Sequence, residues 1–196
     1  MDLSALQLHL THGQVLWALS RGRAPERRLV DQVRYLRLLG VPFRKSELGT
    51  GSGNRLHYRY EHLIDLGVGV WALERGMKPK EVAKFLVKER KLLRELYIKA
   101  LAEQPDEAIE AEWVKSRGRL VPLLGNELFL RLHDRYSDKP GRYEMLRPDE
   151  IEQLSEFSML AERYPGEKAR MLLPLTRLAL ELVAWAREAP VLKPGP

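Results

Sequence analysis

The chain has no cysteine among its 196 residues. Disulfides, thiolate zinc sites and cysteine-ligated iron–sulfur clusters are therefore excluded, and the absence is compatible with a cytosolic protein. Long hydrophobic runs are also missing, since no stretch reaches the roughly 18 consecutive apolar residues of a membrane span. The first residues, MDLSALQLHLTHG, carry no basic leader ahead of an apolar core. We therefore expect no signal peptide, a cytoplasmic location and no membrane partner.

The signatures of common active sites are absent as well. The glycine-rich segment GTGSGN at 49–54 lacks the Gly-Lys-Ser/Thr ending of a phosphate-binding loop. No serine lies in a nucleophile-elbow pattern, and none of the five histidines has metal-ligand spacing to a group of carboxylates. We expect a protein that is not an enzyme, with no catalytic residue, no metal site and no cofactor.

The sequence is rich in basic residues, and they are placed unevenly. Residues 1–104 hold 19 lysines and arginines against 11 acidic residues, a net charge of +8, whereas residues 105–196 hold 14 against 16, a net charge of −2. The hydrophobic content of 44% is enough for one or two small globular domains. The charge division favours a first half that meets a polyanion and a second half that does not.

Two helices joined by a turn are expected near the start of the chain. Thr11 is a suitable N-cap for a short helix that Gly22 ends. Pro25 fits the first turn of a second helix, which Gly40 ends and Pro42 prevents from continuing. Apolar residues recur at helical spacing in this second helix, at Leu29, Val30, Val33 and Leu36. Arginine and glutamine occupy its remaining faces, as in a helix-turn-helix.

A β-hairpin is expected at 41–60. The glycines of GTGSGN permit the positive φ angles of a hairpin tip. After the tip the residues alternate, with Leu56, Tyr58 and Tyr60 pointing one way and Arg55, His57 and Arg59 the other. A ribbon with one apolar and one cationic face predicts a wing that contacts phosphates. An ordinary surface hairpin would give the same pattern, but the flanking helices favour the wing.

Two further helices are expected at 61–73 and 78–103. Gly67 and Gly69 disfavour a helix, so we expect close packing there. The second helix carries an apolar stripe from Val82 to Leu101, longer than one small domain needs. A partner helix is therefore expected, either from a second subunit or from the later part of the chain.

Pro105 marks a change of composition and is our predicted domain boundary. Beyond it, 106–117, 148–164 and 166–188 predict amphipathic helices, the last with a kink at Pro174. The segment 120–136 fits a strand and a helix about equally, and we favour a helix. Apolar side chains in this half fit a hydrophobic effector pocket or a plain core, and the core needs less assumption. They are Trp113, Phe129, Tyr136, Tyr143, Phe157, Met171 and Trp185.

The order of elements in residues 10–104 resembles the DNA-binding domain of the MerR family. Three segments carry the resemblance: VRYLRLLGVP at 33–42, RLHY at 55–58 and LERGMKPKEV at 73–82. They are similar, in that order, to the end of the family's recognition helix, its returning wing strand and its helix–glycine–helix connection. The chain differs where Leu36 and Arg37 replace the family's second aromatic and acidic residue, and its turn before Arg34 is longer.

The resemblance implies a mainly α protein with a winged helix-turn-helix domain at 10–104 and a small hairpin wing, followed by a helical region at 105–196. It implies phosphate or groove contacts by Arg34, Tyr35 and Arg55, and we expect Arg27, Arg28 and Gln32 to read base edges. The full set of expected DNA contacts is Arg27, Arg28, Gln32, Arg34, Tyr35, Arg37, Arg44, Lys45, Arg55, His57 and Arg59.

The expected function is a nucleoid-associated transcription regulator that binds double-stranded DNA as a homodimer. Its second half would serve assembly, another protein or a small-molecule effector. The alternative is an architectural or recombination-accessory protein, similar to an excisionase. A helical adaptor that never binds DNA is a third possibility, which the basic first half disfavours.

Overall fold

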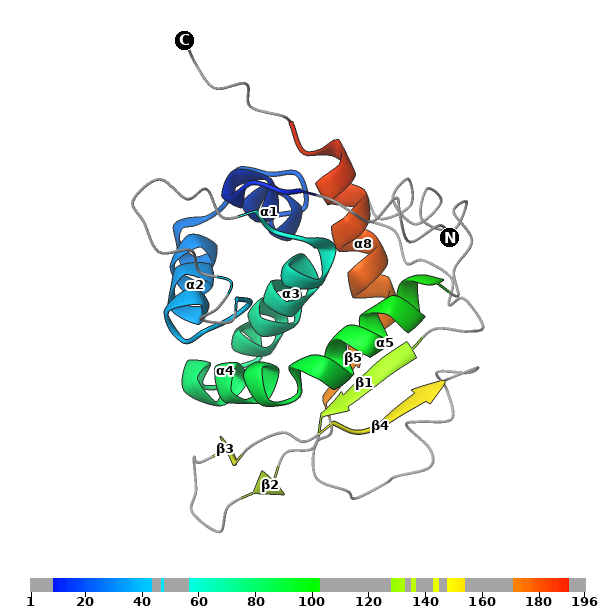
Figure 1. Ribbon diagram of the computed structural model, residues 1–196. Helices are drawn as coiled ribbons and strands as arrows, with labels where there is room; N and C mark the ends of the chain where they lie inside the picture. The colour runs from blue at the N-terminus through cyan, green and yellow to red at the C-terminus, as the bar shows by residue number, and fades with distance from the viewer. Residues whose placement is uncertain are drawn as a thin grey trace.

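The computed structural model describes residues 9–43, 47, 57–102, 128–132, 135–136, 143–144, 148–153 and 171–190. Within these ranges the chain is mainly helical, with six helices: α1 His12–Leu19, α2 Arg27–Leu38, α3 Tyr60–Glu74, α4 Pro79–Lys88, α5 Arg90–Ala102 and α8 Leu175–Glu188. Five short strands are β1 Leu128–Leu132, β2 Arg135–Tyr136, β3 Tyr143–Glu144, β4 Pro148–Gln153 and β5 Met171–Pro174. Figure 1 shows α3 at the centre, with α2 on one side and α5 and α8 on the other.

The predicted helix-turn-helix boundaries are largely confirmed for α1 and α2. The backbone N–H of Gln14 donates to the Thr11 hydroxyl at 3.3 Å, and the backbone N–H of Thr11 donates to the Gln14 side-chain oxygen at 2.9 Å. This capping box satisfies two donors that α1 leaves unpaired. The second helix begins at Arg27 rather than in the turn containing Pro25, with Glu26 at its N-cap. It ends before Gly40, whose φ of 89° suits glycine.

The inward face of α2 packs against α3. Val33 and Leu36 are completely buried, whereas Leu29 and Val30 are half-buried, as the spacing predicts. A Cβ atom added to Gly69 of α3 would lie 2.8 Å from a methyl carbon of Leu36. The expectation of close packing at this glycine is confirmed, because only glycine lets α2 approach α3 to this distance.

Helix α3 is buried on nearly all sides and forms the centre of the core. Every residue from His62 to Val70 is buried. On the side away from α2 it meets α8, where Leu182 lies against Gly67 so closely that a Cβ there would clash with it. Helix α8 also packs against α1 and α5. The partner expected for the apolar stripe is therefore found, for the most part, within the same chain.

The single helix expected at 78–103 is two helices. Helix α4 ends at Lys88, and α5 begins at Arg90 after a break at Glu89. No glycine or proline marks this break. The bend turns Phe85 and Leu86 of α4, and Leu93 and Tyr97 of α5, toward the interior, where all four are buried.

Two segments of the second half that we expected to be helical are strands. Residues 128–132, placed in a helix by our reading of 120–136, form β1, and residues 148–153 form β4. These strands and β5 make an antiparallel sheet in the order β4-β1-β5. Leu130 of β1 pairs with Leu173 of β5, and both are buried. The segment LFLRL forms a strand because the neighbouring strands β4 and β5 supply hydrogen-bond partners on both of its edges, and its alternation suits this conformation.

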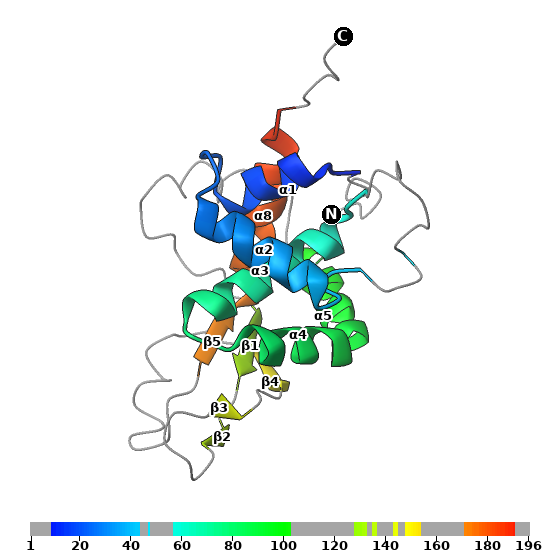
Figure 2. The ribbon, with the colours of Figure 1, turned by 90° about the vertical axis from the view of Figure 1, so that its left-hand side faces the viewer.

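Pro174 ends β5 instead of kinking a helix. Helix α8 starts at Leu175, with Pro174 at its N-cap, so the helix expected from 166 is shorter at its start. Proline has no N–H to donate to a helix interior, and the first helical turn tolerates this loss. The backbone N–H of Leu128 donates to the Thr176 hydroxyl at 2.8 Å and connects the sheet to α8. In Figures 1 and 2 the sheet lies beyond α5, away from α1 and α2.

Several expectations fall outside the described residues. They are the helix at 106–117, the boundary at Pro105 and the tip of the wing. At the base of the expected wing, Leu10 and Tyr58 form an antiparallel bridge, with backbone N–H to oxygen distances of 2.8 and 2.9 Å. Tyr58 is buried, while His57 and Arg59 are exposed, which agrees with the predicted alternation.

Candidate nucleic-acid interface

The outer face of α2 gathers most of the expected DNA contacts. Arg27, Arg28 and Arg34 are exposed, and Tyr35 keeps 40% of its surface accessible. Gln32 and Arg37 are half-buried at the two edges of this face. Because the opposite face is fixed in the core by Val33 and Leu36, the cationic face points outward from a rigid support. Figure 2 shows α2 in front of α3, toward the viewer.

An open hollow of about 520 Å³ runs along one edge of this face. Gln32 and Tyr35 of α2 line one side, and Leu73 and Pro79, from the end of α3 and the start of α4, line the other. Arg27 and Asp31 also border it and form an ion pair at 3.9 Å, both largely exposed to solvent. The lining thus combines apolar side chains with two arginines, Arg27 and Arg28, a combination that suits the sugar and phosphate of a nucleic-acid strand.

The base of the expected wing is anchored by aromatic rings. Phe43 packs on Tyr58 with ring centroids 4.8 Å apart, and His12 Nδ1 lies 3.2 Å from the Tyr58 hydroxyl oxygen. Burial lowers the pKa of His12, and the charge of Arg37 lowers it further. Burial raises the pKa of Tyr58, although the charge of Arg37 lowers it here as well. Three expected contacts, Arg44, Lys45 and Arg55, lie outside the described residues.

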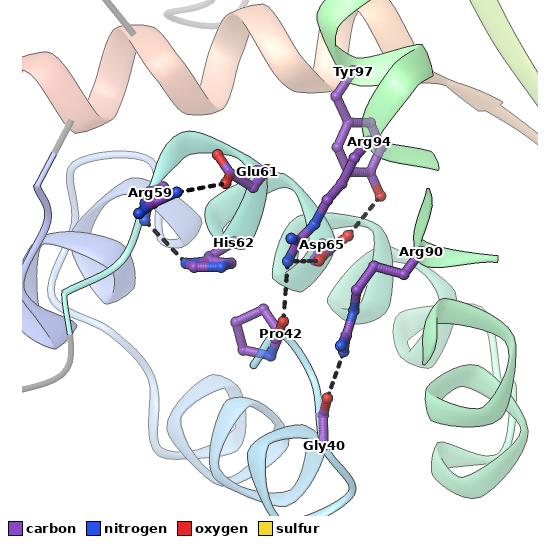
Figure 3. Close-up of polar contacts among 9 residues, drawn as sticks. All are labelled: Gly40, Pro42, Arg59, Glu61, His62, Asp65, Arg90, Arg94 and Tyr97. Carbon is purple, nitrogen blue, oxygen red and sulfur yellow. Dashed lines mark hydrogen bonds and ion pairs between the residues drawn. The ribbon is translucent and has the colours of Figure 1, made fainter. Parts of the chain in front are cut away.

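The carboxyl end of α2 is held by α5, as Figure 3 shows. The guanidinium of Arg90 donates to the carbonyl oxygen of Gly40 at 2.7 Å. One turn further along α5, Arg94 donates to the carbonyl oxygen of Pro42 at 3.3 Å. Both carbonyls belong to the segment that leads out of α2, just after its C-cap at Leu39. The two arginines thus fasten this segment to α5.

A buried carboxylate supports this arrangement. Asp65 of α3 is 1% exposed, accepts a hydrogen bond from the Tyr97 hydroxyl at 3.0 Å, and pairs with Arg94 at 3.5 Å (Figure 3). Burial raises the pKa of Asp65 to about 7, although Arg94, Tyr97 and Arg90 oppose the rise. Asp65 therefore supplies the countercharge that lets Arg94 lie partly buried beside the end of α2.

His62, one turn before Asp65, is buried as a neutral group. Its Nδ1 accepts a hydrogen bond from the backbone N–H of Arg59 at 3.1 Å, and its ring packs on Phe43 at 4.6 Å. Burial, followed by the charge of Arg94, lowers its pKa to about 4. The bond fixes the start of α3 next to the wing base, so His62 has a structural role here.

The sequence analysis did not identify Asp65, Arg90, Arg94 and Tyr97 as parts of the site. One signal was present: Asp65 is the only charged residue between His62 and Leu73, in a segment otherwise made of apolar residues and glycine. A charge in such a position needs a buried partner. Residue spacing could not identify the cation that pairs with Asp65, because Arg94 lies far from Asp65 along the chain.

Other kinds of site find no support in the part of the chain that the structure describes. No three histidine, aspartate or glutamate side chains gather there as metal ligands. None of the described helices is both long and apolar enough to cross a membrane. Comparison with known proteins gives no match: no family model, no curated protein and no solved structure resembles this chain significantly.

Proposed function

We propose that this chain is a sequence-specific DNA-binding transcription regulator that places α2 in the major groove. The observation that carries the proposal is the division of α2 into an inward apolar face centred on the buried Val33 and Leu36 and an outward face that is rich in arginine. The outward face has four arginines, Arg27, Arg28, Arg34 and Arg37, and one acidic residue, Asp31. Four positive charges less one negative charge leave +3 on this face. With its side chains an α-helix is about 10–12 Å across, and the major groove is about 12 Å wide, so α2 can lie in the groove.

The neighbours of α2 agree with this role. The hollow beside Gln32 and Tyr35 can accept a strand of the DNA backbone, while Arg34 lies centrally on the exposed face. His57 and Arg59 extend the basic surface toward the wing. The protein would act on DNA in the cytoplasm, with Arg28 and Gln32 reading base edges.

We further propose that the protein binds as a homodimer. Three large apolar side chains of α4 and α5, Val87, Leu92 and Ile98, are between 38% and 43% exposed. A second copy would cover them and place two recognition helices on a symmetric site. Sedimentation at micromolar concentration would show a dimer if this is right, and a monomer that binds a half-site unchanged would refute it.

The decisive experiment selects bound duplexes from random DNA with the full-length protein, then measures affinity for the selected site over a salt series. Arg34→Ala should weaken binding and flatten the logarithmic salt slope by about one unit, because one phosphate contact is lost. Arg187→Ala, an exposed arginine on α8, is the matched control and should leave the slope unchanged. If no sequence is enriched, or Arg34→Ala binds normally, the proposal is wrong.

A further inference from the structure

The turn between α1 and α2 is contacted by α8, from the far end of the chain. Arg21 pairs with Glu181 through two contacts, Nε to Oε1 at 2.8 Å and Nη2 to Oε2 at 3.3 Å. Beside it, the Trp185 ring lies so close to Gly22 that a Cβ atom on the glycine would overlap the ring. The α1–α2 turn therefore rests on one polar and one aromatic side chain of α8.

This turn sets the direction in which α2 leaves α1. Arg21 has a φ of 54° and Gly22 a φ of 70°, so two consecutive residues adopt the left-handed conformation that reverses the chain. Glycine tolerates this conformation, but arginine is uncommon there and needs support from its surroundings. The bidentate pair with Glu181 supplies that support. Helix α2 begins only five residues after Gly22, so a change at the turn alters its orientation.

The contact between the turn and α8 is not a continuous packed interface. A cavity of about 380 Å³ lies between the turn, α3 and α8, bordered by Arg21, Glu26, Trp71, Glu181 and Leu182. Because this space separates much of the turn from α8, α8 supports the turn mainly through its contacts with Arg21 and Gly22. The Glu181 side chain is only 14% exposed. Burial raises its pKa, and the charges of Arg21 and Arg177 oppose the rise.

We propose that α8 is a positioning element for the recognition helix, acting through Glu181 and Trp185 on the α1–α2 turn. This proposal rests on the proposed function and assigns a role to the second half of the chain. A ligand or protein that binds the second half would alter DNA recognition by shifting α8 against the turn. Glu181 and Trp185 touch no DNA themselves, so they affect sequence recognition without contributing to the electrostatic attraction.

The test compares specific with nonspecific binding. Glu181→Gln keeps the size of the side chain and removes its charge. It should weaken binding to the selected duplex about two- to fivefold, the range expected for an ion pair with an exposed partner. Trp185→Leu should weaken it by about tenfold or more. Binding to a random duplex and the salt slope should stay unchanged, because no phosphate contact is lost. Arg187→Gln, on the exposed last turn of α8, is the control.

A double variant separates positioning from a general loss of structure. If Arg21 and Glu181 act through their mutual contact, Arg21→Gln with Glu181→Gln should weaken specific binding no more than the stronger single variant. Effects that simply multiply would overturn the proposal. Equal losses of specific and nonspecific binding, or wild-type binding by both α8 variants, would also overturn it.

A measurement without DNA keeps the result independent of the proposed function. Hydrogen–deuterium exchange of peptides covering residues 20–30 should speed up in Glu181→Gln, while exchange in α3 and α5 stays as in the wild type. If exchange in the turn is unchanged, α8 does not support the turn, whatever the protein binds. If the wild type selects no DNA sequence but exchange rises as expected, the proposed function fails and the mechanical role of α8 stands.

Discussion

The two ends of α2 are held by different physical means. At the carboxyl end, Arg90 and Arg94 of α5 donate to backbone carbonyls, and the buried Asp65 balances their charge. At the amino end, α8 contributes one ion pair with a 68% exposed arginine and one aromatic contact beside a cavity. A buried polar network is costly to disturb, whereas an exposed pair is not. We infer that the carboxyl end secures the fold and the amino end is the adjustable one.

The largest effect is expected from ending the chain at residue 104, which removes part of the hydrophobic core together with the amino-end support. This deletes α8, which buries Leu175, Leu180, Leu182 and Val183. Each buried aliphatic side chain contributes about 1.5–3 kcal/mol, so the loss approaches the 5–15 kcal/mol that stabilises a typical domain. Thermal or urea unfolding of the fragment 1–104 should lack a cooperative transition. A fragment that melts cooperatively near the full-length temperature would show that the first half has its own core.

Breaking the carboxyl end should have the next largest effect. Arg94→Met leaves Asp65 buried without its paired cation, and breaking a buried pair costs about 3–5 kcal/mol. The free energy of unfolding should fall by about 3 kcal/mol in urea titrations above the pKa of Asp65. Arg94→Lys, which keeps a cation, should lose clearly less. A loss below about 1 kcal/mol for Arg94→Met would mean that the network adds little, and the comparison between the two ends would fail.

The pH dependence of stability should distinguish the groups at the carboxyl end. The pKa of Asp65 is raised to about 7, so between about pH 4 and 7 the folded state holds a proton that the unfolded state has lost, and stability falls as the pH rises. The pKa of His62 is lowered to about 4, so between about pH 4 and 6.5 the unfolded state binds the extra proton, and stability rises with pH. The two slopes oppose each other.

Asp65→Asn should uncover the His62 slope. Relative to the wild type, the variant should gain up to about 1.4 kcal/mol of stability per pH unit as the pH rises from about 4 to 6.5. Urea unfolding at several pH values measures this difference directly. Curves for the variant and the wild type that run parallel through this window would contradict the buried position of Asp65.

The two glycines of α3 allow its contact with α2 and its contact with α8 to be disturbed separately. Gly69→Ala pushes on Leu36 of α2, and Gly67→Ala pushes on Leu182 of α8. Overpacking costs about 1–3 kcal/mol, from which the better helix propensity of alanine recovers up to about 1 kcal/mol. Both variants should lower the melting temperature. Gly13→Ala in α1, where the nearest atom is 3.9 Å away, should not lower it. Equal behaviour of all three would argue against close approach at α3.

The smallest effect on stability is expected at the exposed face itself. Arg27 pairs with Asp31 at 3.9 Å, with side chains 96% and 65% exposed, and neither end of α2 depends on this pair. Such pairs contribute little. Arg27→Ala should therefore leave the melting temperature unchanged while altering the selected DNA sequence at one or two positions. A clear loss of stability would show that the outer face takes part in the fold.

The sequence alone determined α1, α2 and α3, although not the break between α4 and α5. Thr11 predicted the start of α1 because a capping side chain acts within one turn, and Val33 and Leu36 predicted the buried face of α2 because helical periodicity is local. Gly67 and Gly69 predicted close approach, since a helix tolerates glycine poorly unless a neighbour needs the space. The basic outer face of α2 followed from the same periodicity, before any neighbour was known.

Only the tertiary structure decided the rest. The segment LFLRL became a strand because β4 and β5, distant in sequence, supply its hydrogen-bond partners. Asp65 contacts Arg94 and Tyr97 on another helix, and Arg21 pairs with Glu181, 160 residues away in sequence. Periodicity and capping act over a few residues, whereas the countercharge of a buried carboxylate can come from any element that packs beside it. The supports at both ends of α2 are contacts of this second kind, and the sequence could not identify their partners.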